Sequence, residues 1–389
     1  MHIDFLKRFL GKSSNNLPKN SNYKEHLYAL VLAGGGGTRL WPRSRNKSPK
    51  QFLPLFEGKT LTQITLSRLN KILPWEKIFV VTVSEDYRKE ILKEVPQMIK
   101  ENILVEPARR ETGPAHGLGA LYISKIDPEA VIITESADRL VKPIERYLEI
   151  LQSSAKVSFE KKIMIAMGVK PRYANPGYGH IKRGTKWGEV DGATFFKLDK
   201  FIEKPPLELA EKYTKSGEYY WNAGQFVWRA DTFLSSLEKH APEVFKELVE
   251  IKKAIGTEKE ESVLKKAYES MPQISIDYAV AEKDSNFLVV DGDFHWTDIG
   301  DWKEVWENLP KNESNNVIID GDIPGGRVIN IDTSETLVHL DGRLIAMVDV
   351  DDIAIVDTKD VLLVCKKSSA QSVKKVVEQL KKEKEIKYL

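Results

Sequence analysis

The sequence predicts an α/β fold with a mostly parallel mixed sheet, followed by a small β module and a terminal helix. From residue 27 onward, short apolar runs alternate with amphipathic stretches, as strands and crossover helices do. Beyond residue 306, short β-branched runs follow one another too closely for crossover helices. The chain has 389 residues, more than one hydrophobic core usually organises, so a large domain and a smaller one are expected.

Apolar runs predict buried strands in the first part of the chain, at residues 27–33, 78–83, 103–105, 131–134 and 163–169. Helical spacing of apolar residues predicts helices between these strands, at residues 60–73, 85–99, 112–124 and 144–157. After residue 169 the pattern is more mixed, with strands expected at 178–183 and 196–203 and helices at 207–215 and 232–240. We expect residues 23–309 to form one large domain.

The C-terminal part, residues 310–389, is predicted to be a compact β module with one helix. Its β-branched runs lie at residues 317–319, 328–331, 337–340, 344–348, 353–356 and 361–365, with Asp and Gly turns between them. Either a meander or a short β-solenoid fits this spacing. Apolar residues at helical spacing in the tail, residues 368–389, predict an amphipathic helix on the module.

Composition excludes several classes of protein and partner. Lys plus Arg total 59 and Asp plus Glu total 57, so the net charge of +2 gives no reason to expect nucleic acid or an anionic membrane as partner. Cys365 is the single cysteine, which excludes an internal disulfide and favours the cytoplasm. Charged residues interrupt the apolar run that a signal peptide needs, so residues 1–22 are predicted to be a flexible extension.

The strongest functional signal follows the first predicted strand, where four consecutive glycines, Gly34 to Gly37, lead into Thr38 and Arg39, with Lys50 further on. Consecutive glycines let the backbone approach a phosphate chain closely and point several N–H groups at it. Arg39 and Lys50 add mobile positive charge. The loop is therefore predicted to bind a polyphosphate.

Two commoner glycine motifs do not fit this loop. A GxxxxGK[ST] phosphate loop ending at Gly58, Lys59 and Thr60 has Leu53 where its first glycine belongs. The GxGxxG pattern of dinucleotide folds fails because Arg39 occupies the last glycine position. An oxidoreductase is therefore the weakest interpretation.

At these residues the sequence resembles the sugar-nucleotide pyrophosphorylases, in particular those that use GTP and mannose 1-phosphate. Their signature is a GGxGTRLWP loop followed by PKQF, and here Gly34 to Pro42 precede Pro49 to Phe52. The resemblance continues, in order, through Glu106–Pro107, Arg110, Pro114–Ala115, Ala137–Asp138, Phe201 to Pro205, Trp221 to Gly224, Ser275 to Asp277 and Trp296 to Trp302. It implies a Rossmann-like nucleotidyltransferase domain with a short β-helix-like module that often mediates self-association, and hence a homodimer.

The resemblance also implies the reaction, in which the phosphate of mannose 1-phosphate attacks the α-phosphorus of GTP in line, giving GDP-mannose and pyrophosphate with Mg²⁺. A phosphate monoester has a second pKa near ~6 and is already largely anionic at neutral pH, so no general base is needed. Catalysis is then mostly alignment and charge neutralisation.

Site residues carry over from the matching motif positions. Arg39 and Lys50 are the implied catalytic residues, and Asp138 and Asp298 the implied ligands of Mg²⁺, which prefers carboxylate, phosphate and water oxygens. The implied nucleotide-binding residues are Gly34, Gly35, Gly36, Gly37, Thr38, Glu106 and Arg110. The implied sugar-phosphate-binding residues are Gly179, Glu203, Lys204 and Asn222.

Three further positions bear on substrate choice. A carboxylate at Glu106 can accept both the N1–H and 2-amino donors of guanine, although a buried structural glutamate is the alternative. Two residues depart from the family pattern: Glu111 stands where Asn is usual, and Arg139 stands where His is usual. Both lie close in sequence to residues expected at the nucleotide.

Two other functions remain open from the sequence. The first is a pyrophosphorylase for another sugar phosphate or another base. The second is a binding protein that kept the fold without turnover. The presence of Arg39, Lys50, Asp138 and Asp298 together argues against the second, because a binding protein needs neither a leaving-group clamp nor a metal pair.

Overall fold

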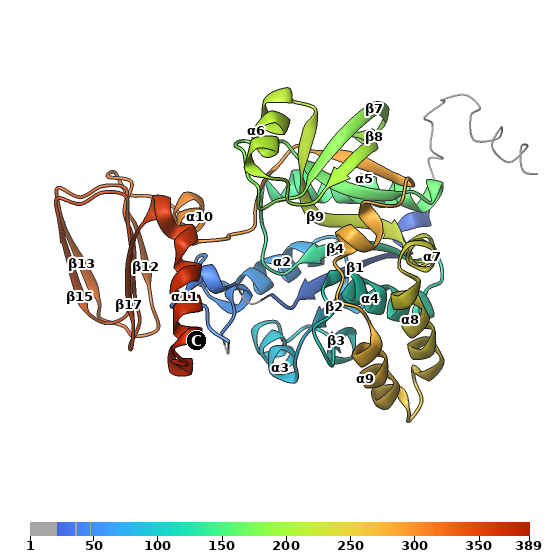
Figure 1. Ribbon diagram of the computed structural model, residues 1–389, viewed down its shortest axis with the longest axis horizontal. Coiled ribbons are helices and arrows are strands. Elements are labelled where there is room, and N and C mark those ends of the chain that lie inside the picture. Colours follow the sequence, from blue (N-terminus) through green and yellow to red (C-terminus); the bar gives the residue numbers. More distant parts are fainter. Residues whose placement is uncertain (1–21, 36, 47) are drawn as a thin grey trace, which may run out of the picture. The chain divides into compact units, whose positions relative to one another are not determined.

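The computed structural model describes residues 22–389 except residues 36 and 47. The predicted extension up to residue 21 and the loop position Gly36 therefore lie outside the described residues. The chain divides into two compact units, and Figure 1 labels their helices and strands. Of the described residues, unit 1 contains 22–29, Arg110–Thr134 and Glu145–Phe294, and unit 2 contains those of Leu30–Arg109, Glu135–Ile144 and His295–Leu389. The linear boundaries expected at residues 22 and 309 remain predictions.

Unit 1 is built on strands in the order β4-β9-β6-β10-β8-β7. The strands are β4 (Val131–Ser136), β6 (Met164–Val169), β7 (His180–Val190), β8 (Ala193–Ile202), β9 (Tyr219–Arg229) and β10 (Phe287–Gly292). Strands β6 and β10 are parallel, and the other neighbouring pairs are antiparallel, with β7 also pairing β9. The helices are α4 (Thr112–Ile126), α5 (Ile144–Lys161), α6 (Leu207–Ser216), α7 (Ala230–His240), α8 (Pro242–Ala254) and α9 (Glu260–Ser270). Helix α4 packs on α7 and α8.

Unit 2 begins with the end of β1 (Leu27–Ala33) and has strands in the order β3-β2-β1, with β2 (Ile78–Thr82) parallel to β3 (Ile103–Val105). Helices α2 (Leu61–Asn70) and α3 (Glu85–Glu94) connect these strands, and a capping box of Thr60 and Gln63 starts α2. A short antiparallel pair joins β5 (Leu140–Lys142) to β11 (His295–Thr297), and α10 (Trp302–Asn308) follows.

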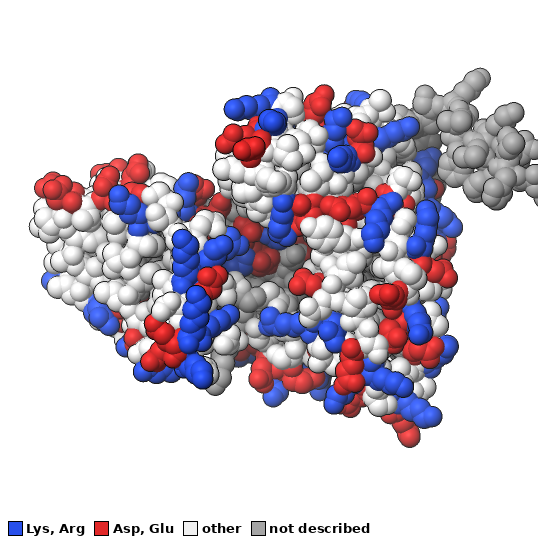
Figure 2. All heavy atoms as spheres, in the orientation of Figure 1, with Lys and Arg blue, Asp and Glu red and all other residues white. Residues whose placement is uncertain are grey.

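The C-terminal module, also in unit 2, is a solenoid rather than a meander. Strands β12 (Val317–Asp320), β14 (Leu337–Leu340) and β16 (Ile353–Asp357) are parallel, as are β13 (Arg327–Ile331) and β15 (Leu344–Val348). A meander would pair consecutive strands in antiparallel fashion, and here only β16 and β17 (Leu362–Lys366) do so among the described strands of the module. Helix α11 (Val373–Lys382) follows, and Figure 2 shows Lys and Arg side chains along it.

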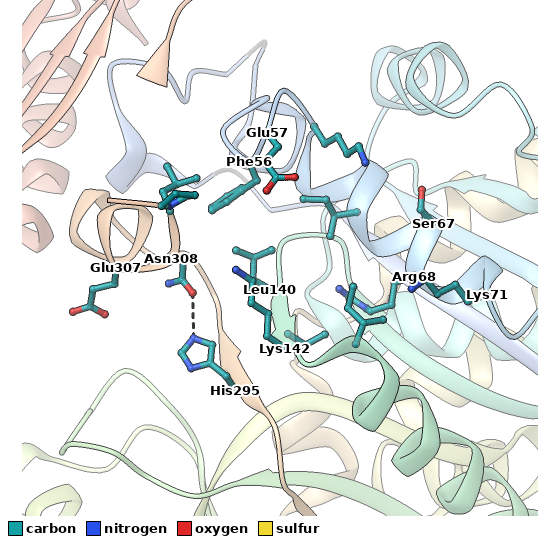
Figure 3. A pocket seen from close by; sticks show the side chains of 16 residues that line it. Phe56, Glu57, Ser67, Arg68, Lys71, Leu140, Lys142, His295, Glu307 and Asn308 are labelled. Carbon is teal, nitrogen blue, oxygen red and sulfur yellow. Dashed lines mark hydrogen bonds between the residues drawn. The ribbon is translucent and has the colours of Figure 1, made fainter. Parts of the chain in front are cut away.

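A pocket of about 840 Å³ opens in unit 2 beside α2, β5 and residues 307–310 (Figure 3). Phe56 and Leu140 contribute apolar surface to it, and His295 lies within hydrogen-bond distance of Asn308, with Nε2 3.1 Å from Oδ1. Lys59, Lys71 and Lys142 are also among its lining residues. None of the site residues predicted from the sequence lines this pocket, so the site has to be located from the side chains themselves.

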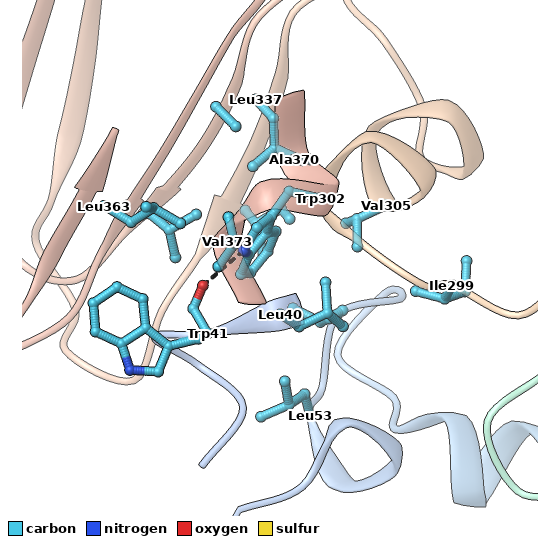
Figure 4. Packing of buried hydrophobic residues seen from close by; sticks show 14 of the residues in the cluster. Leu40, Trp41, Leu53, Ile299, Trp302, Val305, Leu337, Leu363, Ala370 and Val373 are labelled. Carbon is cyan, nitrogen blue, oxygen red and sulfur yellow. Dashed lines mark hydrogen bonds between the residues drawn. The ribbon is translucent and has the colours of Figure 1, made fainter. Parts of the chain in front are cut away.

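One buried apolar cluster runs through unit 2 and ties the glycine loop to the C-terminal module (Figure 4). Leu40 and Trp41 pack there with Leu53, Trp302 and Val373. The indole N–H of Trp302 donates to the backbone oxygen of Trp41 at 3.0 Å. Because residues from the start and end of the chain share this core, the loop and the terminal helix stabilise each other.

Shortening Leu40 should destabilise the protein strongly. Its side chain is 0% exposed in this cluster, so Leu40→Ala is expected to lower the free energy of unfolding by about 2–5 kcal/mol through lost burial and a residual cavity. Chemical denaturation followed by tryptophan fluorescence measures this. Ile318→Ala, at a position 49% exposed on β12, is the control and should change the free energy by about 0.5 kcal/mol or less. Equal effects of the two substitutions would contradict the packing described.

Candidate active site

The glycine loop has backbone positions that only glycine fits. Gly37 has φ 63° and ψ 43° and starts the short 3-10 turn Thr38–Leu40. A Cβ atom on Gly37 would lie 2.3 Å from Cβ of Lys50, and one on Gly34 would lie 2.9 Å from Cγ1 of Val83. By contrast, a Cβ on Gly35 would meet no described heavy atom within 4 Å. Side chains are therefore excluded on one side of the loop, while the other side is open.

A small pocket of about 170 Å³ borders this loop at Thr38. Arg45, Arg109 and Lys381 are among its other lining residues, so three cationic side chains surround it. Arg45 is also held by Asp360, with the Nη2–Oδ1 distance at 2.6 Å. Three segments of the chain in unit 2 therefore place cationic side chains around the pocket beside Thr38.

Lys50 joins both predicted metal ligands. Its Nζ lies 2.6 Å from Oδ2 of Asp138 and donates to the backbone oxygen of Asp298 at 2.5 Å. The Lys50 side chain is nearly buried. The structure thus brings together three residues that are far apart in the sequence.

The pairing of β5 with β11 explains this arrangement. The two strands are antiparallel, and Leu140 is paired with Thr297. Asp138 comes just before β5 and Asp298 just after β11, so both aspartates lie at the same end of the pair. Backbone register, rather than local sequence, places the two carboxylates near each other.

Arg139 also contacts both aspartates. Its Nε lies 3.4 Å from Oδ1 of Asp138 and its Nη1 lies 3.5 Å from Oδ2 of Asp298. Burial alone would raise the pKa of Asp138, but the positive charges of Lys50 and Arg139 outweigh it and lower the pKa to about 2. Asp138 is therefore a carboxylate throughout the neutral pH range.

Arg39 is held by a residue that the sequence analysis did not single out. Its Nη1 donates to Oε1 of Gln371 at 2.7 Å, and Nε2 of Gln371 donates to Oδ2 of Asp301. Asp301 in turn caps the N-terminus of α10, accepting from the backbone N–H groups of Lys303 and Glu304. Gln371 carried no sequence signal, because its function depends on a fold contact with a residue 332 positions earlier.

The donor set at Asp138 and Asp298 fits a hard divalent cation that takes its remaining ligands from a substrate. Within the part of the chain that the structure describes, no group of three or more His, Cys, Asp or Glu side chains could hold a metal ion by itself. Mg²⁺ usually binds one or two carboxylates together with phosphate and water oxygens. Two aspartates beside a loop suited to phosphate meet that requirement, whereas they do not form a closed zinc site.

In unit 1 the four predicted sugar-phosphate residues lie together. A Cβ atom on Gly179 would lie 2.5 Å from Oε2 of Glu203 and 3.1 Å from Cβ of Asn222, so a side chain there would displace Glu203. Nζ of Lys204 lies 2.5 Å from Oε1 of Glu203, and the backbone N–H of Asn222 donates to the oxygen of Gly179 at 2.8 Å. The non-glycine residue Lys204 has a φ of 45°, a strained conformation that often marks functional positions.

Asp277 belongs to the same group, although the sequence analysis gave it no function. Its Oδ1 accepts from Nδ2 of Asn222 at 3.0 Å. Burial and the charge of Glu203 raise the pKa of Asp277 to about 6. The resembling segment Ser275 to Asp277 contained this residue, so the family pattern marked the position but not its function.

Glu106 and Arg110, the predicted nucleotide-binding residues outside the glycine loop, make contacts elsewhere in their own units. Glu106, in unit 2, is buried just beyond β3, and its backbone N–H donates to the oxygen of Thr82 at 2.8 Å. Arg110, in unit 1, donates to the backbone oxygens of Tyr268 and Glu269 near the end of α9, at 2.5 and 3.0 Å. Glu111 has the unusual φ of 66° directly before α4.

Two family models match most of the chain. Residues 28–315 match the family model described as "Nucleotidyl transferase", and residues 326–380 match "MannoseP isomerase/GMP-like beta-helix domain". The second match agrees with the parallel strands of the C-terminal module. Together they confirm the predicted α/β class with a β-helix-like module.

Several relatives are similar over almost the whole chain. Mannose-1-phosphate guanylyltransferase 2 of Escherichia coli O157:H7 is 34% identical over 371 residues, which cover 93% of this chain and 75% of that protein. Mannose-1-phosphate guanylyltransferase of Escherichia coli K12 is 35% identical over 360 residues, covering 91% and 73%. A crystal structure named as mannose-1-phosphate geranyltransferase from Thermus thermophilus has a TM-score of 0.80 at 32% identity, covering 92% of this chain and 99% of that one. The chain therefore belongs to the nucleotidyl transferase family, and within it to the mannose-1-phosphate guanylyltransferases.

Proposed function

We propose that this chain joins GTP and mannose 1-phosphate to give GDP-mannose and pyrophosphate. The observation that carries the proposal is the gathering of Lys50, Asp138 and Asp298 in unit 2, next to Gly37, where a Cβ atom would clash with Lys50. Relatives named for this activity are similar over more than nine tenths of the chain. Another sugar phosphate or base, and a binding protein without turnover, are the alternatives that the first experiment below separates.

In the proposed reaction, an oxygen of the mannose 1-phosphate forms a bond to the α-phosphorus of GTP. The bond from that phosphorus to the oxygen bridging to the β-phosphorus breaks, and pyrophosphate leaves with the electron pair. The attacking phosphate is already anionic at neutral pH, because its second pKa is near ~6. Arg39 and Lys50 neutralise the charge that develops on the leaving pyrophosphate, so they stabilise the transition state more than the bound substrate.

In unit 1, the group around Glu203 holds the sugar phosphate. Lys204 supplies the positive charge for the phosphate, and its side chain is 62% exposed, so it can exchange its contact with Glu203 for an incoming anion. Glu203 and Asn222 provide paired acceptors and donors for sugar hydroxyls. Asp277 adds an acceptor beside Asn222. In unit 2, Glu106 remains the proposed reader of guanine.

The proposed metal is Mg²⁺, held by Asp138 and Asp298 together with phosphate oxygens. When bound, Mg²⁺ supplies positive charge that polarises the phosphoryl oxygens and fixes their orientation. The nucleotidyltransferase family generally uses a divalent metal, and the carboxylate oxygens here are of the type that Mg²⁺ prefers.

We also propose that the enzyme is cytoplasmic and forms a homodimer through its C-terminal module. Support for the dimer comes from the β13–β15 pair, where Ile331 lies opposite Val348 and both side chains are more than half exposed. Leu344, on the same face, is 53% exposed. Among the described residues, no helix is both long and apolar enough to cross a membrane.

Pyrophosphate release should require both GTP and mannose 1-phosphate in the presence of Mg²⁺. The assay is run beside ATP, UTP, dTTP and glucose 1-phosphate, and release with another pair would keep the reaction class but correct the substrates.

In the same assay, Asp298→Asn is expected to lower kcat about a hundredfold, the size typical of losing one preorganised charge contact. Asp322→Asn, at an exposed ion pair with Arg43, is the matched control and should stay near wild type. If no substrate pair releases pyrophosphate although nucleotide binds tightly, the protein is a binding protein without turnover.

Asp277 should make stability depend on pH in a direction opposite to that of most aspartates. Its pKa is raised to about 6 in the folded protein, so its stabilising contribution is complete below its ordinary value of 3.8 and is lost as the pH rises through about 6. The difference in Tm between wild type and Asp277→Asn should therefore shift in favour of the variant between pH 5 and pH 7.5. Thermal unfolding at both pH values, without ligand, measures this, and a constant difference would contradict the buried position of Asp277.

Charge on the β13–β15 face should separate the proposed dimer. The variant Ile331→Glu/Val348→Glu is expected to have the mass of one 44.3 kDa chain in light scattering, against twice that mass for wild type. Ile386→Glu, at a position that is also well exposed but outside this face, should leave the mass unchanged. A monomeric wild type, or a variant that remains dimeric, would contradict the proposal that this face is the dimer interface.

A further inference from the structure

Arg139 already supplies a positive charge to the two carboxylates proposed to bind the metal. Its guanidinium contacts Asp138 through Nε at 3.4 Å and Asp298 through Nη1 at 3.5 Å. The Arg139 side chain is only 19% exposed. The group therefore contacts both carboxylates at once from a largely buried position.

The position of Arg139 is fixed by the same strand pair that places the aspartates. Arg139 directly precedes Leu140, which pairs with Thr297, and Asp298 directly follows Thr297. The neighbouring pair Val141 and Trp296 brings the indole under the guanidinium, whose carbon lies 5.1 Å from the ring centroid. Such stacking on a buried tryptophan favours a cation at this point.

The local charges balance without any metal ion. Lys50 contacts Oδ2 of Asp138, and Arg139 contacts Oδ1 of the same carboxylate, so both oxygens have a cationic partner. Two carboxylates and two cations sum to zero. A divalent ion entering this group would add two positive charges beside Lys50 and Arg139, and like charges at such distances repel strongly where water is largely excluded.

We propose that Arg139 competes with the divalent metal for Asp138 and Asp298, so that the metal binds weakly alone and firmly together with the triphosphate. This proposal rests on the proposed function, because it assumes that the two aspartates are the metal ligands. The four negative charges of a nucleoside triphosphate offset the added metal charge and offer the guanidinium another partner. A first ligand that removes a competing contact raises the affinity for the second, which is positive coupling between nucleotide and metal.

The test is the binding of Mn²⁺, measured from the paramagnetic resonance signal of the free ion, with no turnover involved. Without nucleotide, Arg139→Gln should bind Mn²⁺ about tenfold more tightly than wild type, since a competing unit charge is removed. Arg139→Lys keeps a positive charge and should remain closer to wild type. Arg327→Gln, which removes a charge from the exposed strand β13 of the same unit, is the matched control and should leave the affinity unchanged.

Further variants keep the test decisive. Arg139→Met fills a similar volume over Trp296 and should reproduce the tighter binding, which covers the case where the glutamine variant does not fold. Adding Asp138→Asn to Arg139→Gln should abolish the gain, because the metal then lacks a ligand. Equal or weaker Mn²⁺ affinity in Arg139→Gln and Arg139→Met overturns the proposal. If Mn²⁺ binding with GTP is unaffected by Asp138→Asn and Asp298→Asn, then the assignment of these aspartates as metal ligands fails instead.

Discussion

The packing of Leu40 and Trp41 against Trp302 and Val373 is the contact on which the site in unit 2 depends. The glycine loop has little side-chain surface of its own, so its conformation must be fixed by the residues that follow it. The indole N–H of Trp41 donates to the backbone oxygen of Tyr388 at 2.8 Å, so a hydrogen bond adds to the apolar packing. A loop that binds phosphate through backbone N–H groups gains affinity from such rigidity, because less conformational freedom is lost on binding.

Charge pairing also stabilises the site in unit 2. Lys50 is nearly buried, and a buried ammonium requires a partner. Asp138 is that partner. The positive charge of Lys50 in turn lowers the pKa of Asp138. In unit 1 the effect on the acid is the opposite: burial, together with the charge of Glu203, raises the pKa of Asp277. The acidic group therefore suits hydroxyl donors, and the group in unit 2 suits phosphate and metal.

Those parts of the fold that depend on neighbouring residues could be predicted from the sequence. The strands at residues 27–33 and 103–105 follow from apolar runs in the local sequence and were predicted correctly. The helix predicted at 85–99 ends at Glu94, because Pro96 disfavours a helical conformation at Val95. Strand β9 was not predicted, since Asn222 and Gly224 interrupt its apolar run. Contacts of Gln371 and Arg139 depend on strand register and long-range packing, which no local pattern records.

Unit 2 combines segments that are far apart in the chain, so the ribosome synthesises its first segment long before its last. Residues 30–109 emerge early, but the cluster around Leu40 and Trp41 is completed only after residues 302–377 have been made. Contacts across such sequence separations form slowly, because a long loop must close first. During that interval the nascent chain exposes an incomplete apolar surface of the kind that chaperones bind. The glycine loop, which is synthesised early, therefore reaches its final packing only after the C-terminal segments of unit 2 have been synthesised.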